Sequence, residues 1–248
     1  MGVTGDVNGG PVKVGVALTD VCTGLVLQSA IGAALYSREK SGKGQHVCTS
    51  LLETQVACMI NLASSYLNAS TIPSRLGTAH ASIVPYQAFQ TRDGYIVIGA
   101  GNDIQFRNLC ESLELPELLH NERYASNASR VRNREELLQK LQAKLSQMET
   151  QEVEHALSES GCPCGPVNRL DEVFENEQVQ HLQMVHEMNG QKLMRAPVTF
   201  SETKTSLRKG APMLGEHTRE VLHEVLGYGD DTIDSLHDKK HIYCYEAS

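Results

Sequence analysis

The 248-residue sequence contains no tryptophan, and its 22 Lys and Arg side chains are outnumbered by 30 Asp and Glu. The formal net charge of −8 comes without a stripe of basic residues, so the sequence lacks the electrostatic footprint of a nucleic-acid-binding protein. A local positive pocket for a small anion is still compatible with this charge. With 40% hydrophobic and 21% charged residues, the composition is typical of a globular protein rather than a disordered or fibrous one.

Familiar motifs of metal and phosphate chemistry are also missing. The ten histidines are predicted not to form a metal site; His217 and His223, for example, lie six residues apart on an expected helix and point to different faces. The sequence has no G-x-S-x-G elbow, P-loop or G-x-G-x-x-G fingerprint. Residues 99–102 could offer backbone N–H groups to an anion, although such a turn is more often only a helix entry. We therefore expect no metal and assign no catalytic residue.

Cysteine usage and the N-terminus indicate a chain without disulfides, membrane spans or targeting signals. Cys162 and Cys164 are the only close pair, which is weak evidence for a zinc site. We expect no apolar run long enough to cross a bilayer, and residues 1–16 resemble neither a signal nor a transit peptide. The seven cysteines are odd in number and scattered, which favours reduced thiols in an intracellular compartment: Cys22, Cys48, Cys58, Cys110, Cys162, Cys164 and Cys244.

The first part of the chain predicts an α/β layer. Asp20 can cap a helix over residues 21–40 that is apolar on nearly every side, as in a helix buried between layers. Residues 45–49 form a short β-prone run. Ser50 and Glu53 then have the spacing of a capping box and open a second apolar helix. Only twenty residues precede the first helix, so its cover is expected from more of the same polypeptide or from a partner.

Residues 84–195 are predicted to form a compact α+β unit. Two β-prone runs, 86–90 and 95–100, flank an Asp-Gly turn and indicate a hairpin. The Asn189-Gly190 pair marks a second hairpin. Between them, a set of apolar side chains recurs at helical spacing and is assigned to the core: Leu137, Leu138, Leu141, Leu145 and Met148.

Residues 77–89 read GTAHASIVPYQAF, in which small side chains and one histidine, His80, precede Pro85 and Tyr86. Small residues in such number pack poorly as a helix or a strand. The segment is therefore either slack chain between domains or a backbone kept slim so that another molecule can approach it closely. The residues alone leave both alternatives open.

Five sequence blocks, taken together and in order, resemble the C-terminal half of class III coenzyme A transferases of the CaiB/BaiF type. They are GVALTDVCTGL (15–25), SGKGQHVCTSLLET (41–54), GTAHASIVPYQAFQTRDGYIVIGAGN (77–102), GCPCGPVN (161–168) and PMLGEHTREVLHEVLGY (212–228). The resemblance implies transfer of coenzyme A between an acyl-CoA, here succinyl-CoA, and a dicarboxylic acid such as glutarate or hydroxymethylglutarate. It also implies a mitochondrial location and no cofactor beyond the CoA thioester substrate. An acyl-CoA racemase of the same fold and a non-catalytic partner subunit are the alternatives.

The family fold implied by the resemblance is α/β, with a Rossmann-like large domain built from both ends of the chain and a smaller α+β domain inserted between them. Residues 1–69 and 196–248 would belong to the large domain, which would be partial because the N-terminal half is missing. Residues 84–195 would be the small domain, and residues 70–83 the linker and active-site lid loop. Full-length chains of the family would form interlocked homodimers.

The same resemblance implies where the site lies. The family's lid is glycine-rich, whereas residues 78–82 here read Thr-Ala-His-Ala-Ser, which predicts a stiffer lid. His80 either contacts the acceptor acid or is an ordinary exposed loop residue. The family's catalytic aspartate lies in a Gly-Tyr-Asp motif, which this sequence lacks, and Gly227-Tyr228-Gly229-Asp230 belongs to a different block. The implied substrate-binding residues are Gly77, Thr78, His80, Pro85 and Tyr86.

Overall fold

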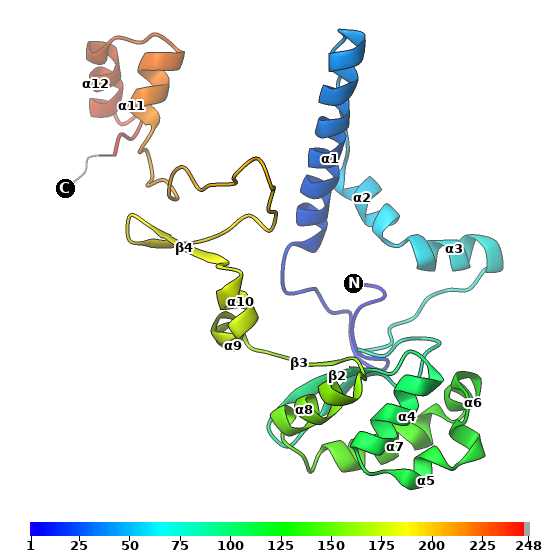
Figure 1. The fold of residues 1–248 in the computed structure, drawn as a ribbon. Helices are drawn as coiled ribbons and strands as arrows, with labels where there is room; N and C mark the ends of the chain where they lie inside the picture. Colours follow the sequence, from blue (N-terminus) through cyan, green and yellow to red (C-terminus); the bar gives the residue numbers. More distant parts are fainter. Residues whose placement is uncertain (246–248) are drawn as a thin grey trace. The chain divides into compact units, whose positions relative to one another are not determined.

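The computed structural model describes residues 1–245 (Figure 1). The chain divides into two compact units between Val167 and Asn168, and each is described here by itself. Both units combine helices with short antiparallel strands, so the mixed α/β class is confirmed. The finer division of the chain into a large and a small domain stays a prediction.

Helix α1 (Leu18–Ser41) is the long apolar helix that the sequence predicts. It begins after Ala17 rather than Asp20, which lies in the first turn, where a carboxylate interacts favourably with the helix dipole. It ends at Gly42, which has a left-handed backbone (φ 70°) and donates its N–H to the carbonyl oxygen of Arg38 at 2.8 Å. Every side chain of α1 is at least partly exposed within the described structure.

The length of α1 corrects one expectation. Its 24 residues are long and apolar enough to cross a membrane by length and composition, whereas the sequence was expected to hold no such stretch. The reason for the difference is that the polar residues of α1 are small and uncharged over most of its length. Because the core helix of a protein outside the membrane passes the same test, this property does not place the chain in a bilayer.

Two shorter helices follow, α2 (Leu51–Cys58) and α3 (Ile60–Ala69). The predicted capping box is confirmed in part: Ser50 Oγ accepts a hydrogen bond from the N–H of Glu53 at 3.2 Å, but the Glu53 carboxylate accepts from the Ser50 hydroxyl, at 2.7 Å, in place of the Ser50 backbone N–H. Two other predictions are wrong. The single helix expected after Ser50 is interrupted at Met59, and residues 45–49 lie outside the strands that the described residues form.

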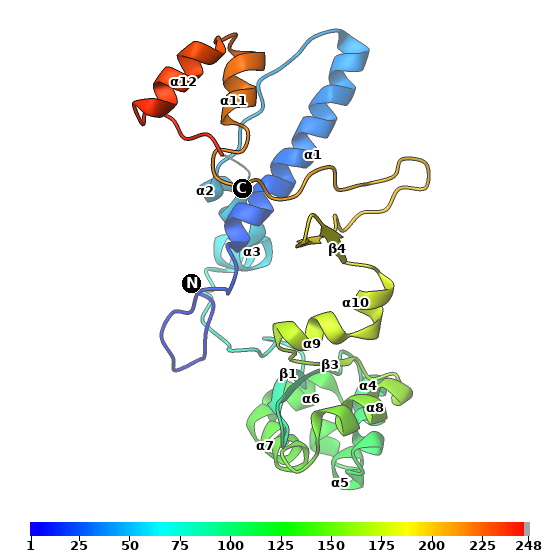
Figure 2. The ribbon, with the colours of Figure 1, turned by 90° about the vertical axis from the view of Figure 1, so that its left-hand side faces the viewer.

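A three-stranded antiparallel sheet and five helices form the compact body that begins at Val84 (Figure 2). The predicted hairpin is confirmed, with β1 (Tyr86–Gln90) paired to β2 (Tyr95–Gly99), and β3 (Cys164–Pro166) adds to the other edge of β2. Tyr86 pairs with Gly99 in the register. The surrounding helices are α4 (Asp103–Ser112), α5 (Pro116–Leu119), α6 (Asn127–Arg132), α7 (Arg134–Leu145) and α8 (Thr150–Ser160).

The core of this body contains the predicted leucine stripe. Leu137, Leu141 and Leu145 are fully buried, and Leu138 and Met148 pack against the same cluster. The side chains that complete the cluster come from the strands and from α4 and α8, including Phe89, Ile96, Ile98, Phe106, Leu109, Val153 and Leu157. The hairpin and the helices are therefore joined by one apolar core.

An asparagine stands at the N-cap position of both α4 and α7, but its side chain caps only α4. Asn102 caps α4, accepting a hydrogen bond from the N–H of Gln105 at 2.9 Å. Asn133 stands at the N-cap position of α7, but its side chain accepts two hydrogen bonds from the guanidinium of Arg123, at 3.0 and 2.7 Å. Glu136 forms ion pairs with Arg123 and Lys140. The nearby arginine therefore takes the side chains that would otherwise cap the helix.

Within residues 168–245, the second unit contains a second hairpin and five helical elements. Asn189 and Gly190 both have positive φ, 52° and 74°, so the predicted Asn-Gly turn is confirmed. After Glu216 the chain forms an α-helical turn followed by a π-helical segment, which stops near Gly227. The elements are α9 (Leu170–Glu175), α10 (Glu177–His181), β4 (Val185–Met188), β5 (Gln191–Met194), α11 (Thr218–Glu220), η2 (Val221–Val225) and α12 (Asp230–Asp238).

Candidate functional site

The loop before β1 begins at a position that requires glycine. Gly77 has φ +60°, and a Cβ atom there would lie 3.3 Å from Oδ1 of Asp6. Its N–H donates to the carbonyl oxygen of Gly5 at 2.9 Å, and Arg75 Nη2 donates to the carbonyl oxygen of Gly9 at 2.7 Å. The start of the loop is therefore held against the N-terminal segment of the chain.

His80 and Tyr86 form a stacked pair at the centre of the loop. Their ring centroids are 5.5 Å apart with an interplanar angle of 13°, and the N–H of His80 donates to the carbonyl oxygen of Tyr86 at 2.9 Å. His80 Nδ1 accepts a hydrogen bond from the N–H of Ser82 at 3.2 Å. This bond assigns the proton of the neutral ring to Nε2. Because both side chains are exposed, the pair offers one N–H donor and one aromatic face to a ligand.

Thr78 and Pro85 have structural roles on either side of this pair. Thr78 Oγ1 accepts a hydrogen bond from the N–H of Ala88 at 3.0 Å, which ties the loop to β1. Pro85 is buried, and its carbonyl oxygen accepts from the N–H of Ala100 at 3.0 Å. The structure thus brings Thr78, His80 and Tyr86 together on an exposed surface. Pro85 shapes the base of the loop instead of offering a side chain to a substrate.

Arg130 fixes the end of the loop from inside the core. Its side chain is fully buried, with its guanidinium 4.4 Å from the centroid of the Phe106 ring. Nε donates to the carbonyl oxygen of Val84 at 2.8 Å, Nη1 to that of Tyr124 at 3.0 Å, and Nη2 to Asp103 Oδ1 at 2.8 Å. A buried cation needs partners of this kind, so the geometry around Val84 is strongly fixed.

Two more side chains of the small body hold the loop backbone. Asn127 donates from Nδ2 to the carbonyl oxygen of Ser82 at 2.8 Å and accepts at Oδ1 from the N–H of Val84 at 3.1 Å. Arg134 donates to two carbonyl oxygens nearer the start of the loop, those of His80 and Ala81. Sequence reasoning missed both residues and Arg130, because their partners in the loop are main-chain atoms 43 to 54 positions away. The only available signal was the small size of the loop residues, which leaves their carbonyl groups open to such donors.

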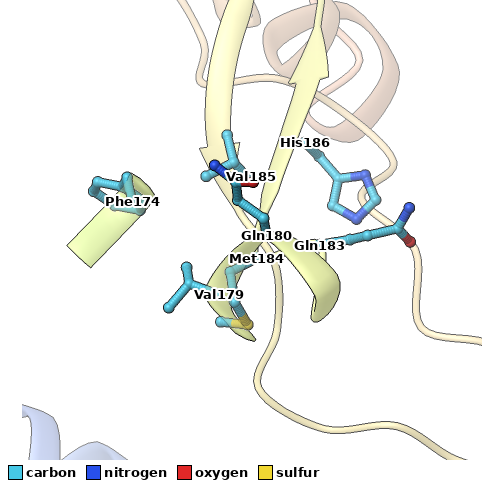
Figure 3. A pocket seen from close by; sticks show the side chains of 7 residues that line it. All are labelled: Phe174, Val179, Gln180, Gln183, Met184, Val185 and His186. Carbon is cyan, nitrogen blue, oxygen red and sulfur yellow. The ribbon is translucent and has the colours of Figure 1, made fainter. Parts of the chain in front are cut away.

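The hollow shown in Figure 3 is a weaker candidate for a reactive site. Its walls come from α9, α10 and β4, and His186 is the one titratable side chain among the seven that line it. A single exposed histidine beside apolar side chains has no base, acid or nucleophile to work with. The seven lining residues are Phe174, Val179, Gln180, Gln183, Met184, Val185 and His186.

The remaining reactive groups do not converge on a second site. His237 and His241 stand four residues apart, a spacing that the sequence analysis overlooked, but residues 1–245 contain no group of three or more His, Cys, Asp or Glu placed to hold a metal ion. Burial raises the pKa of the Cys110 and Cys162 thiols to about 12. Such thiols stay protonated at neutral pH and are poor nucleophiles.

The loop and its supports lie within a segment that matches one protein family along most of the chain. The sequence profile of CoA-transferase family III matches residues 1–218, and the chain belongs to this family. A crystal structure of a CaiB/BaiF family protein from Brucella suis superposes on it with a TM-score of 0.80 at 36% identity, covering 91% of this chain and 60% of that one. The family resemblance drawn from the five sequence blocks is therefore confirmed.

Curated relatives narrow the comparison. The chain is 44% identical over 241 residues to the succinyl-CoA:glutarate CoA-transferase of Homo sapiens, which covers 95% of this chain and 55% of the relative. It is 36% identical over 230 residues to the succinate–glutarate CoA-transferase of Agrobacterium fabrum, covering 91% of this chain and 58% of the relative. The chain thus spans about half the length of the curated relatives that it matches.

Proposed function

We propose that this chain serves the transfer of coenzyme A from succinyl-CoA to glutarate or a closely related dicarboxylic acid, such as hydroxymethylglutarate. The observation that carries the proposal is the 44% identity, over 95% of the chain, to the human enzyme named for this reaction. The relatives named above are transferases, which favours transfer over racemisation.

The chemistry implied by family membership is covalent catalysis. An aspartate carboxylate attacks the thioester carbonyl carbon, so that an acyl–oxygen bond forms, the carbon–sulfur bond breaks and CoA leaves as a thiolate. The CoA thiolate then attacks the aspartyl carbonyl carbon of this mixed anhydride, and succinate leaves. Glutarate displaces CoA from the resulting aspartyl thioester, and CoA attacks the glutaryl carbonyl carbon of the new anhydride to give glutaryl-CoA and the free aspartate. The Gly-Tyr-Asp motif of this aspartate is not among the 248 residues. We propose that the part of the relatives that this chain does not span supplies it.

The loop of this chain would position the acceptor acid. His80 carries its proton on Nε2, where it can donate a hydrogen bond to a carboxylate, and the Tyr86 ring beneath it keeps the imidazole in one orientation. The small side chains at Ala79, Ala81 and Ser82 let a substrate approach the backbone closely. Thr78 holds the loop on β1 through its hydroxyl oxygen, and the hydroxyl proton can still be donated to a substrate.

The experiment for this role is the substitution His80→Ala in an active enzyme assembled with the N-terminal half of the human relative. We expect the KM for glutarate to rise about tenfold, as for the loss of one charge-assisted hydrogen bond, while the KM for succinyl-CoA stays nearly unchanged. His155→Ala, an exposed histidine on α8, is the matched control and should change neither value. Equal changes in the KM of both substrates, or no change in either, would show that His80 is an ordinary loop residue without a role in binding the acceptor.

Three further features are proposed on the same basis. We infer that residues 1–69 and 196–248 form part of a Rossmann-like large domain, whose remaining elements would cover the exposed apolar side chains of α1. The complete enzyme would be an interlocked homodimer located in mitochondria. The length of the relatives and the exposure of α1 support the first two proposals, whereas the mitochondrial location rests on the family resemblance. Sedimentation and cell fractionation of the complete enzyme test them.

A further inference from the structure

The guanidinium of Arg134, the first residue of α7, bonds to main-chain oxygens of the loop. Its Nη2 donates to two consecutive carbonyl oxygens of the loop, that of His80 at 2.9 Å and that of Ala81 at 2.7 Å. One terminal nitrogen of a guanidinium carries two hydrogens, so both bonds can exist together. The contact joins residues 54 and 53 positions apart in the sequence.

Carboxylates lie close to Arg134 in the sequence, so an ion pair was an available alternative to these hydrogen bonds. Two carboxylates follow it directly, Glu135 and Glu136, yet Glu136 pairs with Arg123 and Lys140. Arg134 forms no ion pair within residues 1–245. Its half-buried guanidinium therefore bonds to neutral main-chain oxygens. Hydrogen bonds with a charged donor are the stronger class, so these two bonds fix the loop backbone.

The anchors act on different parts of the loop. Arg130 and Asn127 hold Val84 and Ser82 at its end, and both of these side chains belong to α6. Arg134 is the side chain that reaches the carbonyl group of His80, the residue whose ring stacks on Tyr86. Without the Arg134 bonds, the main chain of His80 and Ala81 would keep, within the described residues, only the hydrogen bond from the His80 N–H to the Tyr86 carbonyl oxygen, while the end of the loop stays fixed.

We propose that Arg134 is a positioning residue for the acceptor acid. It acts through His80, because it holds the loop closed at this residue. It holds the backbone at His80 and Ala81, so that the imidazole stays on Tyr86 and its Nε2–H keeps one direction. The loop opens for substrate exchange when these two bonds break. The part of this proposal that concerns the acceptor rests on the proposed function, whereas the part that concerns the loop does not.

The loop part is tested by hydrogen exchange with mass spectrometry on the 248-residue chain. We expect Arg134→Gln to speed exchange about tenfold in peptides covering residues 78–82, where the amides of His80 and Ser82 are hydrogen-bonded, and to leave β2 and α8 unchanged. Arg134→Lys, which keeps a donor, should give a smaller increase. Arg132→Gln is the matched control, since Arg132 bonds only to Ser129 within the described residues. Unchanged exchange in Arg134→Gln would overturn the proposal.

The acceptor part is tested by kinetics in the active enzyme assembled with the human N-terminal half. Arg134→Gln should raise the KM for glutarate and leave that for succinyl-CoA unchanged, with partial rescue by Arg134→Lys. The double variant with His80→Ala should be no worse than His80→Ala alone, because Arg134 acts through His80. Additive effects would contradict that route. If His80→Ala changes neither KM, the proposed role of His80 fails, and the exchange result alone decides whether Arg134 holds the loop.

Discussion

Arg130 is the residue on which the loop geometry depends most. Its guanidinium is removed from water and satisfied by two carbonyl oxygens and one carboxylate, of which the Val84 carbonyl belongs to the end of the loop. The Asp103 side chain is itself 59% exposed, so this carboxylate can be rehydrated when the arginine is removed. The carbonyl groups of Val84 and Tyr124 would lose a buried partner.

We therefore expect Arg130→Met to lower the free energy of unfolding by about 3 kcal/mol, through the unpaired carbonyl groups and the altered packing on Phe106. Chemical denaturation followed by far-UV circular dichroism measures the change. Arg132→Gln, on the exposed side of the same helix, should change the free energy by less than about 0.5 kcal/mol. An Arg130→Met variant as stable as the parent chain would show that the buried guanidinium contributes nothing.

At this scale the sequence predicts the site only in part. The resemblance leads directly to His80 and Tyr86, which the structure brings together, and to Gly77, whose positive φ explains the glycine. It also included Pro85, which is buried. The arginines that hold the loop were missed because an arginine in a helix reads as a solvated residue until the fold brings a distant carbonyl group to it.

The β1–β2 hairpin and the N-terminus of α8 are joined by Asp93. Oδ1 of Asp93 accepts hydrogen bonds from Thr150 Oγ1 at 2.7 Å and from the Thr150 N–H at 2.8 Å. The hydroxyl of Thr150 and then its backbone N–H hold the pKa of Asp93 below its ordinary value of 3.8. Since the pKa is lowered in the folded state, the contact stabilises the fold above pH 3.8 and loses its contribution as the pH falls through the lower folded value.

Asp93→Asn should therefore be less stable than the parent chain at pH 6. The difference in the free energy of unfolding between the two proteins should become smaller as the pH falls toward 3. The urea midpoint measured at both pH values tests this, because the asparagine cannot titrate. Glu152→Gln, which changes a carboxylate in the first turn of the same helix, is the control and should not reproduce the narrowing. A gap that stays constant with pH would show that the charge of Asp93 is not what joins these elements.

The secondary-structure elements that could be predicted from the sequence are those marked by a local signal, such as a turn dipeptide. The turns Asp93-Gly94 and Asn189-Gly190 carry their own backbone preferences, and both hairpins form where the sequence predicts them. The strand expected at residues 45–49 depends on a neighbouring strand to pair with, which a β-prone sequence cannot supply by itself. The break at Met59 likewise has no local marker, since neither glycine nor proline stands there.

At the scale of the whole molecule, the exposed apolar side chains of α1 stand out. Leu25 is 61% exposed and Tyr36 is 63% exposed, although the helix has the composition of one buried between layers. The small body from Val84 to Cys162, by contrast, has a complete apolar core. The fold of that body was predictable from local patterns, whereas no local pattern says what would cover the apolar side chains of α1.

The central claim is that this chain carries the acceptor loop of a family III CoA-transferase while the nucleophile is supplied by the part of the relatives that it does not span. The most direct measurement is the formation of glutaryl-CoA from succinyl-CoA and glutarate, followed by chromatography. We expect no product from the pure 248-residue chain, and product when the N-terminal half of the human relative is joined to it or added. Product from the pure chain that survives replacement of Asp20 and of Asp230, one at a time, would contradict the account.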